Sequence, residues 1–171
     1  MHAEFLALRL IHILSAITWL GSGIFTTFFL IPAVSSSPAV MGQVVAGLQR
    51  RRVFLYLQIA AGLTILSGLR LIWIDSAGFS ASYWDTPMGN TLGMAALLAI
   101  VAAVLSFGVS FPARERAGKI AGSLAAVTDA GEKARLTQQI QRLQRRATNA
   151  SVASVGFGIL AAAGMAVARY V

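Results

Sequence analysis

Long apolar runs separated by shorter polar segments dominate the chain. Four runs are long enough to cross the hydrocarbon core of a bilayer, which takes about 20 apolar residues in a helix. They cover residues 5–34, 53–74, 88–111 and 150–167. Pro32 and Pro112 lie where the first and third apolar runs end. The pattern predicts an all-α integral membrane protein whose four transmembrane helices form a bundle.

The polar segment between the third and fourth runs has a helical pattern of its own. Its apolar residues recur at helical spacing and form one stripe. These residues are Leu136, Ile140, Leu143 and Ala147. Asp129 followed by Glu132 resembles a capping box at the start of a helix. Residues 113–147 are therefore expected to extend the third and fourth helices beyond the membrane as a basic hairpin, within a single domain of residues 1–171.

Two pairs of short matching segments suggest an internal repeat. Ile31-Pro32-Ala33 ends the first run, and Phe111-Pro112-Ala113 ends the third. Leu48-Gln49-Arg50-Arg51 precedes the second run, and Leu143-Gln144-Arg145-Arg146 precedes the fourth. Matching motifs at the ends of successive apolar runs are typical of parallel structural repeats in membrane proteins. It favours two tandem helical hairpins.

The distribution of Lys and Arg predicts the orientation in the membrane. Eleven of the 14 cations lie after the first or the third run, whereas residues 75–87, between the second and third runs, contain none. The positive-inside rule places the segments rich in Lys and Arg in the cytoplasm. Both termini are then outside, in a multi-pass protein that we expect in a bacterial cytoplasmic (inner) membrane.

The composition agrees with a lipid environment. Of the 171 residues, 57% are hydrophobic and 12% are charged, against about 25% charged residues in soluble domains. The net charge of +8 is explained by cations that flank apolar spans, so nucleic acid is not expected as a partner. The absence of cysteine excludes disulfides, thiolate metal sites and cysteine nucleophiles.

Ionisable side chains inside the membrane are costly and therefore mark candidate sites. Arg9 and His12 lie in the outer half of the first run, and Arg70 lies in the outer half of the second. With a rise of 1.5 Å per residue, the two arginines lie about 7 Å below the outer ends and His12 about 12 Å below. Trp19 and Gly23 continue the face of His12, which leaves room beside the imidazole for a flat ligand.

Haem b has the properties that such a site would accept. Its iron binds imidazole, for which His12 is the candidate, and its propionates bind cations such as Arg9 and Arg70. The second axial ligand is expected from Met94 or from His12 of a second subunit in a homodimer. Two simpler interpretations remain open. A membrane histidine can bond a hydroxyl or carbonyl of a neighbouring helix, and arginines near helix ends can reach the headgroups without any ligand.

The first helix resembles that of a known group of membrane proteins. The resemblance covers the segment LRLIHILSAITWLG at residues 8–21 and the closing Ile31-Pro32-Ala33, with Trp19 seven residues after His12. The group comprises the copper-resistance protein D family, the HemJ-type protoporphyrinogen oxidases and related four-helix membrane proteins. The resemblance implies that His12 is a haem b ligand. The third run lacks the lysine that HemJ-type proteins carry on a later helix, which argues against protoporphyrinogen oxidation.

Two other functions stay open at this point. Copper handling is one, because thioether and imidazole ligands suit Cu(I). Its candidate ligands near the outer face are Met1, His2, Met88 and Met94. The other is an accessory or scaffold subunit that packs into a larger membrane complex through faces of small residues. No hydrolase constellation or acidic relay across the bilayer is present, so no enzymatic activity is assigned.

Overall fold

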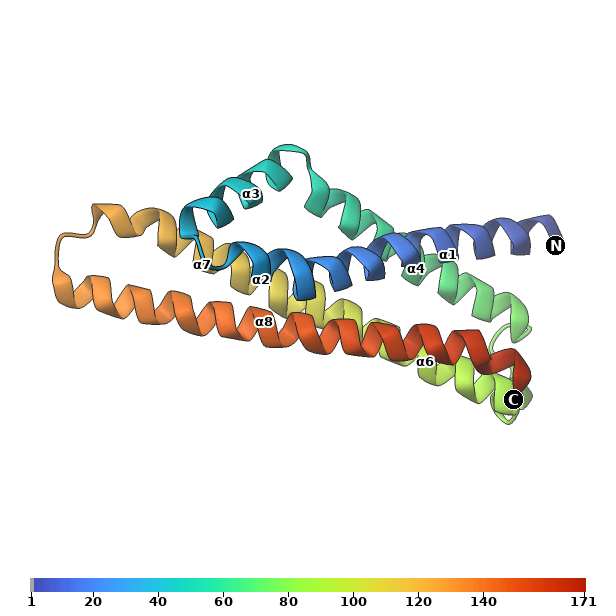
Figure 1. The fold of residues 1–171 in the computed structure, drawn as a ribbon. Helices are drawn as coiled ribbons and strands as arrows, with labels where there is room; N and C mark the ends of the chain where they lie inside the picture. The colour runs from blue at the N-terminus through green and yellow to red at the C-terminus, as the bar shows by residue number, and fades with distance from the viewer. Residues whose placement is uncertain (1) are drawn as a thin grey trace.

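The computed structural model describes residues 2–171 and contains four helical runs long and apolar enough to cross a membrane. The runs cover His2–Val34, Val53–Asp75, Pro87–Ser123 and Ala130–Tyr170. No strand occurs in the described part of the chain. The two ends of the chain lie at the same end of the molecule (Figure 1), as an even number of crossings requires. The predicted all-α fold, with four helical runs long and apolar enough to span a membrane, is confirmed.

Each run consists of one or more helical elements. The first contains α1 (His2–Phe25), the π-helical segment η1 (Thr26–Leu30) and α2 (Ile31–Val34). It is followed by α3 (Pro38–Arg50), α4 (Val53–Asp75) and the short α5 (Ala81–Trp84). The third run contains α6 (Pro87–Ala103), the π-helical η2 (Val104–Ser110) and α7 (Phe111–Ser123). A turn with η3 (Leu124–Ala126) leads to α8 (Ala130–Val167) and the 3-10 segment η4 (Ala168–Tyr170).

Pro32 and Pro112 do not break their helices. Each proline lies at the second residue after a π-helical segment, and the helix continues past it. The amide of Ile31 bonds the carbonyl of Thr26, and the amide of Phe111 bonds that of Ser106, five residues back in each case. A π turn moves the carbonyls that the proline ring would strike in a regular α-helix. The helix therefore continues past each proline.

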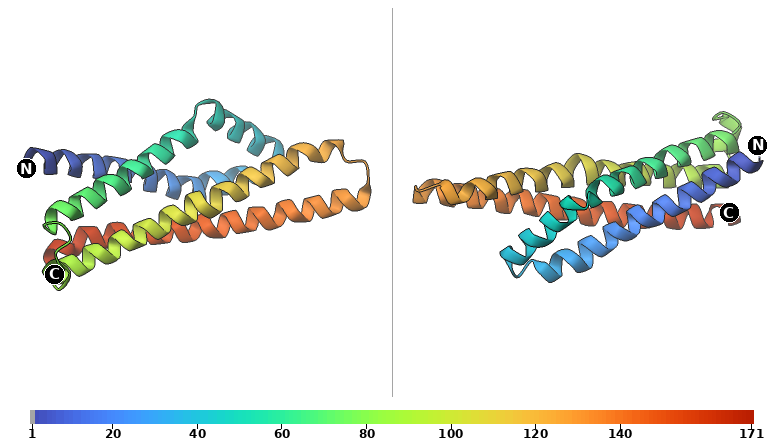
Figure 2. Two further views of the ribbon diagram at one scale, coloured as in Figure 1. Left: turned by 180° about the vertical axis from the view of Figure 1, so that it is seen from behind. Right: turned by 90° about the horizontal axis from the view of Figure 1, so that it is seen from above.

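The four runs form two antiparallel hairpins, as the repeat predicted. α1 packs along α4, and α6 with η2 and α7 packs along α8, whereas contacts between the two hairpins are sparse. Figure 2 shows α1 and α4 crossing beside the longer second hairpin. The second hairpin extends well past the first. After its turn, Asp129 caps the N-terminus of α8, and its carboxylate accepts the Glu132 amide at 2.6 Å. The expected continuation of the third and fourth helices is present.

Small residues at heptad spacing form the seam of the second hairpin. On the last run the buried residues Ala147, Ser154, Ala161 and Ala168 are seven residues apart. On the facing run the buried residues are Ala95, Ala102, Ser110 and Ala117. The step from Ala102 to Ser110 is eight residues, because η2 lies between them and its π turn takes up one extra residue. The π segment thus keeps the seam in register beyond Pro112, and small side chains let the helices approach closely.

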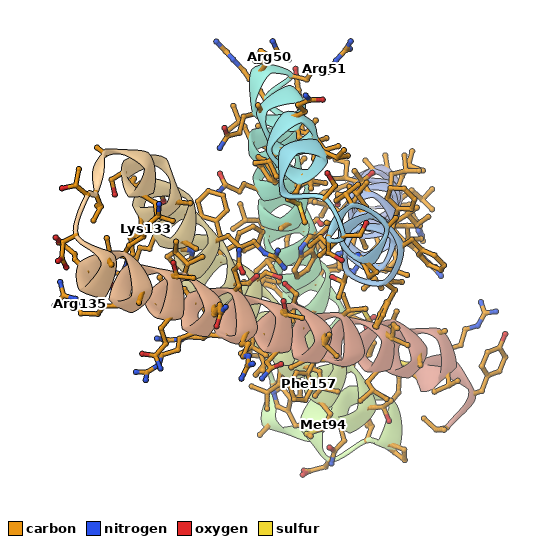
Figure 3. The ribbon with its side chains drawn as sticks, turned by 60° about the vertical axis from the view of Figure 1, so that its left-hand side comes forward. Arg50, Arg51, Met94, Lys133, Arg135 and Phe157 are labelled. Carbon is orange, nitrogen blue, oxygen red and sulfur yellow. The ribbon has the colours of Figure 1, made fainter. Side chains whose placement is uncertain are left out.

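A separate helix, α3, lies between the first and second runs. Ser37 caps α3, with its hydroxyl accepting the Val40 amide. The chain then turns at Arg52, whose φ of 53° is left-handed, before α4 begins. Figure 3 shows Arg50 and Arg51 projecting away from the molecule at this corner. In the second hairpin the matching Leu143-Gln144-Arg145-Arg146 lies inside the continuous α8, so the two hairpins differ here.

The orientation in the membrane is a prediction with a direct test. Single cysteines at Ser82 and Ser123, both exposed and at opposite ends of the bundle, replace serines in a chain that has no cysteine of its own. A membrane-impermeant maleimide added to intact cells should label Ser82→Cys and spare Ser123→Cys until the cells are opened. The reverse pattern of labelling would show that the termini are inside.

Candidate functional site

The imidazole of His12 packs against α4 at Gly68. We call Gly68, with the neighbouring Thr64 and Ser67, the His12 seat. A Cβ atom built on Gly68 would lie 2.9 Å from Cε1 of His12, so only glycine leaves space for the imidazole. The ring reaches over Gly68 to the backbone of the preceding turn, where its Nδ1 lies 2.9 Å from the carbonyl oxygen of Thr64. The contact joins α1 to α4 and fixes the ring orientation.

The Thr64 carbonyl also fixes the tautomer of His12. A carbonyl oxygen only accepts, so Nδ1 must carry the proton that it donates. In the neutral imidazole the lone pair is then on Nε2. Nε2 has no hydrogen-bond partner among the described residues, and no fully buried side-chain nitrogen or oxygen among them lacks a partner. Nε2 is therefore an accessible acceptor, which is the state that a metal-ligating histidine needs.

Three hydroxyl groups surround the His12 seat. The Thr64 hydroxyl donates to the Ala60 carbonyl at 2.8 Å, and its oxygen lies 3.0 Å from Ser15 Oγ. Ser67 Oγ lies 3.3 Å from His12 Nδ1 and donates to the Leu63 carbonyl. All three hydroxyls are buried and bonded, so the network holds α1 and α4 together without leaving unsatisfied groups in the membrane.

A cavity of about 80 Å³ lies where the two hairpins meet, and His12 is part of its wall. When the space open to solvent at its mouth is included, the volume not filled by atoms is about 560 Å³. The rest of the wall is apolar and consists mostly of small residues from α6 and α8: Ala99, Ala102, Gly158, Ala161 and Ala162. The hydroxyls of Thr64, Ser106 and Ser154 and the thioether of Met165 also line it.

Trp19 and Gly23 lie on the wall of the same cavity as His12. Trp19 stacks on Phe107 of η2, with ring centroids 6.2 Å apart and 25° between the planes. Gly23 faces Val155 of α8 at ordinary contact distance. The face of α1 that the sequence singled out therefore points at the second hairpin.

The two arginines do not line the cavity. Arg70 donates from Nη2 to a carboxylate oxygen of Glu4 at 2.7 Å, and its Nε donates to the same oxygen at 3.1 Å. Both side chains are about half exposed, so the pair contributes little to stability. Arg9 is exposed. The exposed guanidinium of Arg9 can thus contact an anionic ligand, whereas Arg70 would first have to break its ion pair with Glu4.

Met94 is not brought near His12. It is 54% exposed and borders a shallow surface depression with Pro87 and Leu160 rather than the His12 cavity. Figure 3 shows it at the outer side of α6. The methionine that shares the cavity with His12 is Met165, which the sequence analysis did not single out.

The candidate copper ligands are Met1, His2, Met88 and Met94, and the structure describes the last three. Met1 lies outside the described residues, and His2 is exposed. Within residues 2–171, no group of three or more His, Asp or Glu side chains is close enough to hold a metal ion together.

Sequence reasoning also missed Thr64, Ser67 and Gly68, which make the His12 seat. A signal was present, because these three small or polar residues lie within five positions of an otherwise apolar helix. Their relation to His12 depends on the crossing of α1 and α4, which periodicity does not give.

No family model, curated protein or solved structure matches this chain. The resemblance of the first helix to the copper-resistance protein D and HemJ-type group therefore stays an expectation. Function has to be argued from the site itself.

Proposed function

We propose that this membrane protein binds haem b in the cavity between its two hairpins, with Nε2 of His12 as an axial ligand, for a redox or haem-handling role. One observation carries the proposal. Donation from Nδ1 to the Thr64 carbonyl leaves the lone pair on Nε2 of a histidine that lines a mostly apolar cavity. Metal-ligating histidines are commonly oriented by such a bond from the other ring nitrogen.

The composition of the cavity walls suits a flat apolar ligand. Five of the lining residues are alanine or glycine on α6 and α8, and Trp19 supplies an aromatic wall on α1. A tetrapyrrole needs more space than about 80 Å³, so the hairpins must move apart to admit it. Sparse contacts between the hairpins support such a movement, because few packed side chains would be separated.

The residues of the site would have separate tasks. Bound haem would supply one-electron chemistry at its iron, tuned by the axial ligand and its surroundings. The Thr64 carbonyl keeps His12 in the Nε2-ligating tautomer, and Gly68 gives the ring its place. Met165 is the thioether in the same cavity and is the candidate for a second axial ligand. Arg9 is the exposed cation nearest to His12 along α1.

Titration of the purified protein in mild detergent tests this proposal against copper. Haem and Cu(I) are added in separate titrations, and binding is followed by visible absorption and by competition with a Cu(I) chelator. We expect saturable binding of haem near one per chain, with a sharpened Soret band, and no saturable binding of Cu(I). Binding of Cu(I) alone would favour copper handling. Binding of neither would favour an accessory subunit, and a larger membrane complex should then co-purify with the protein.

A further inference from the structure

Arg114 differs from every other cation of the chain. Of the 14 Lys and Arg side chains, 13 are exposed, and Arg114 alone is partly buried. It lies in the first turn of α7, against the middle of α8. No carboxylate in the described part of the chain lies within ion-pair distance of it, whereas Lys119 on the same helix pairs with Glu115 at 2.7 Å. Arg114 is a half-buried charge without a counter-ion.

Two serines position the Arg114 guanidinium. Its Nη2 donates to Ser151 Oγ of α8 at 3.1 Å, and its Nε lies 3.4 Å from Ser110 Oγ. The two hydroxyls also bond each other at 2.7 Å. This arrangement fixes the plane of the guanidinium, because it is held at two nitrogens by two different helices.

The guanidinium keeps donors for a further partner. It has five N–H groups, and the bonds to Ser110 and Ser151 use two of them. Nη1 has no partner among residues 2–171, and none of their fully buried side-chain nitrogens or oxygens is unpaired. Nη1 is therefore reachable from outside the protein, and it can donate beside Nη2 to two oxygens of one anion.

The depth of Arg114 indicates which anion is available. Ser151 is the second residue of the apolar run 150–167, and Ser110 is the last but one of the run 88–111. A group that touches both serines lies where the two apolar runs end, which is the level of the lipid phosphates. Basic pockets between transmembrane helices at this level suit anionic headgroups.

We propose that Arg114, oriented by Ser110 and Ser151, is a binding site for one phosphate group. The anion is the phosphate of an anionic phospholipid or a free phosphate, since both offer two oxygens to the Nη1–Nη2 edge. The anion balances the charge that the protein leaves unpaired. Arg114, Ser110 and Ser151 do not line the His12 cavity, so the phosphate site does not depend on haem.

Lipid and phosphate binding to the delipidated protein in detergent tests the site. The probes are dihexanoyl phosphatidylglycerol, dihexanoyl phosphatidylcholine and inorganic phosphate, and the readouts are bound molecules per chain by native mass spectrometry and the shift of the unfolding temperature. The variants are Arg114→Ala and Arg114→Lys. Arg116→Ala is the matched control, because Arg116 is on the same helix and exposed.

We expect one saturable phosphatidylglycerol per chain, weakened about tenfold or more by Arg114→Ala because a charge-assisted contact is lost. Arg114→Lys, which keeps the charge but lacks the planar edge, should fall between, and Arg116→Ala should bind as the wild type does. Competition by inorganic phosphate would identify phosphate itself as the ligand, and its absence would identify the lipid headgroup.

Equal weakening by Arg114→Ala and Arg116→Ala would overturn the proposal, since binding would then follow surface charge alone. Equal binding of the zwitterionic phosphatidylcholine and the anionic phosphatidylglycerol, with no effect of Arg114→Lys, would overturn it as well. Should Arg114→Ala fail to fold, Arg114→Lys and Ser151→Ala test the same site, because each alters the donor geometry and keeps a cation.

Discussion

Replacing His12 with alanine is expected to abolish the Soret band of the haem-loaded protein. The change removes the only intramembrane imidazole and its Nε2 lone pair. Loss of the hydrogen-bond partner that orients a metal-ligating side chain costs about 10–100-fold in metal affinity. Loss of the ligating histidine itself should therefore lower the affinity for haem at least about 100-fold. The measurement is haem per chain by the pyridine haemochromogen assay after purification.

Two further variants separate ligation from general damage to the fold. His2→Ala removes the other, exposed histidine and should leave the Soret band unchanged. Gly68→Ala keeps His12 but places a methyl group 2.9 Å from its Cε1, so it should displace the ring and lower haem content. Gly62→Ala, with nothing near its Cβ, should not. Equal haem content in His12→Ala and wild type would rule out His12 as the ligand.

Gly158→Leu is expected to destabilise the protein more than any other single change in the contact between the hairpins. A Cβ at this position would lie 2.7 Å from Cδ1 of Leu20, which leaves no room for a longer side chain. Overpacking of this kind costs about 1–3 kcal/mol. For a chain of this length the unfolding temperature in detergent should fall on the order of 5 °C.

The same substitution two residues earlier is the control. A Cβ atom at Gly156 would have no other atom within 4 Å, and the residue is exposed, so Gly156→Leu should leave the unfolding temperature within about 1 °C of the wild type. Leu160→Ala, at a side chain 57% exposed, should also have little effect. If Gly156→Leu and Gly158→Leu unfold at the same temperature, the contact of α1 with α8 does not stabilise the bundle.

Hydropathy was sufficient to predict the four long apolar runs, and the repeated motifs predicted their pairing into hairpins. Each run is long enough to span a bilayer on its own, so its helix does not depend on details of packing. The same reasoning did not predict the π turn in Val104–Ser110, which lets the helix continue past Pro112. Proline in a membrane helix is tolerated where neighbouring structure re-satisfies the freed backbone groups, and this is a tertiary effect.

The small-residue face of α8 shows a similar limit. The sequence suggests a ladder with a step of four residues through Ala150, Ser154, Gly158, Ala162 and Ala166. In the structure Ala150 and Ser154 of this ladder are buried, whereas Ala162 and Ala166 are exposed. From Ser154 on, the buried small residues Ala161 and Ala168 follow with a step of seven. A step of four turns about 40° further around a helix with 3.6 residues per turn, so it leaves the contact face after a few steps. A step of seven stays close to it.

The site was only partly predictable for the same reason. His12, Trp19 and Gly23 share a face of one helix, and that face lines the cavity. The carbonyl of Thr64, the gap at Gly68 and the thioether of Met165 come from other helices, and their meeting depends on crossing angles. Glu4 was not linked to Arg70, because 66 residues separate them and their pairing requires α1 and α4 to lie side by side.

The haem content of the wild-type protein tests the central claim most directly. The chain is expressed in bacteria supplied with a haem precursor, purified in mild detergent and examined by visible absorption and the pyridine haemochromogen assay. The account predicts a coloured protein with a Soret band and close to one haem b per chain. A colourless protein that stays without a Soret band after haem is added would contradict it.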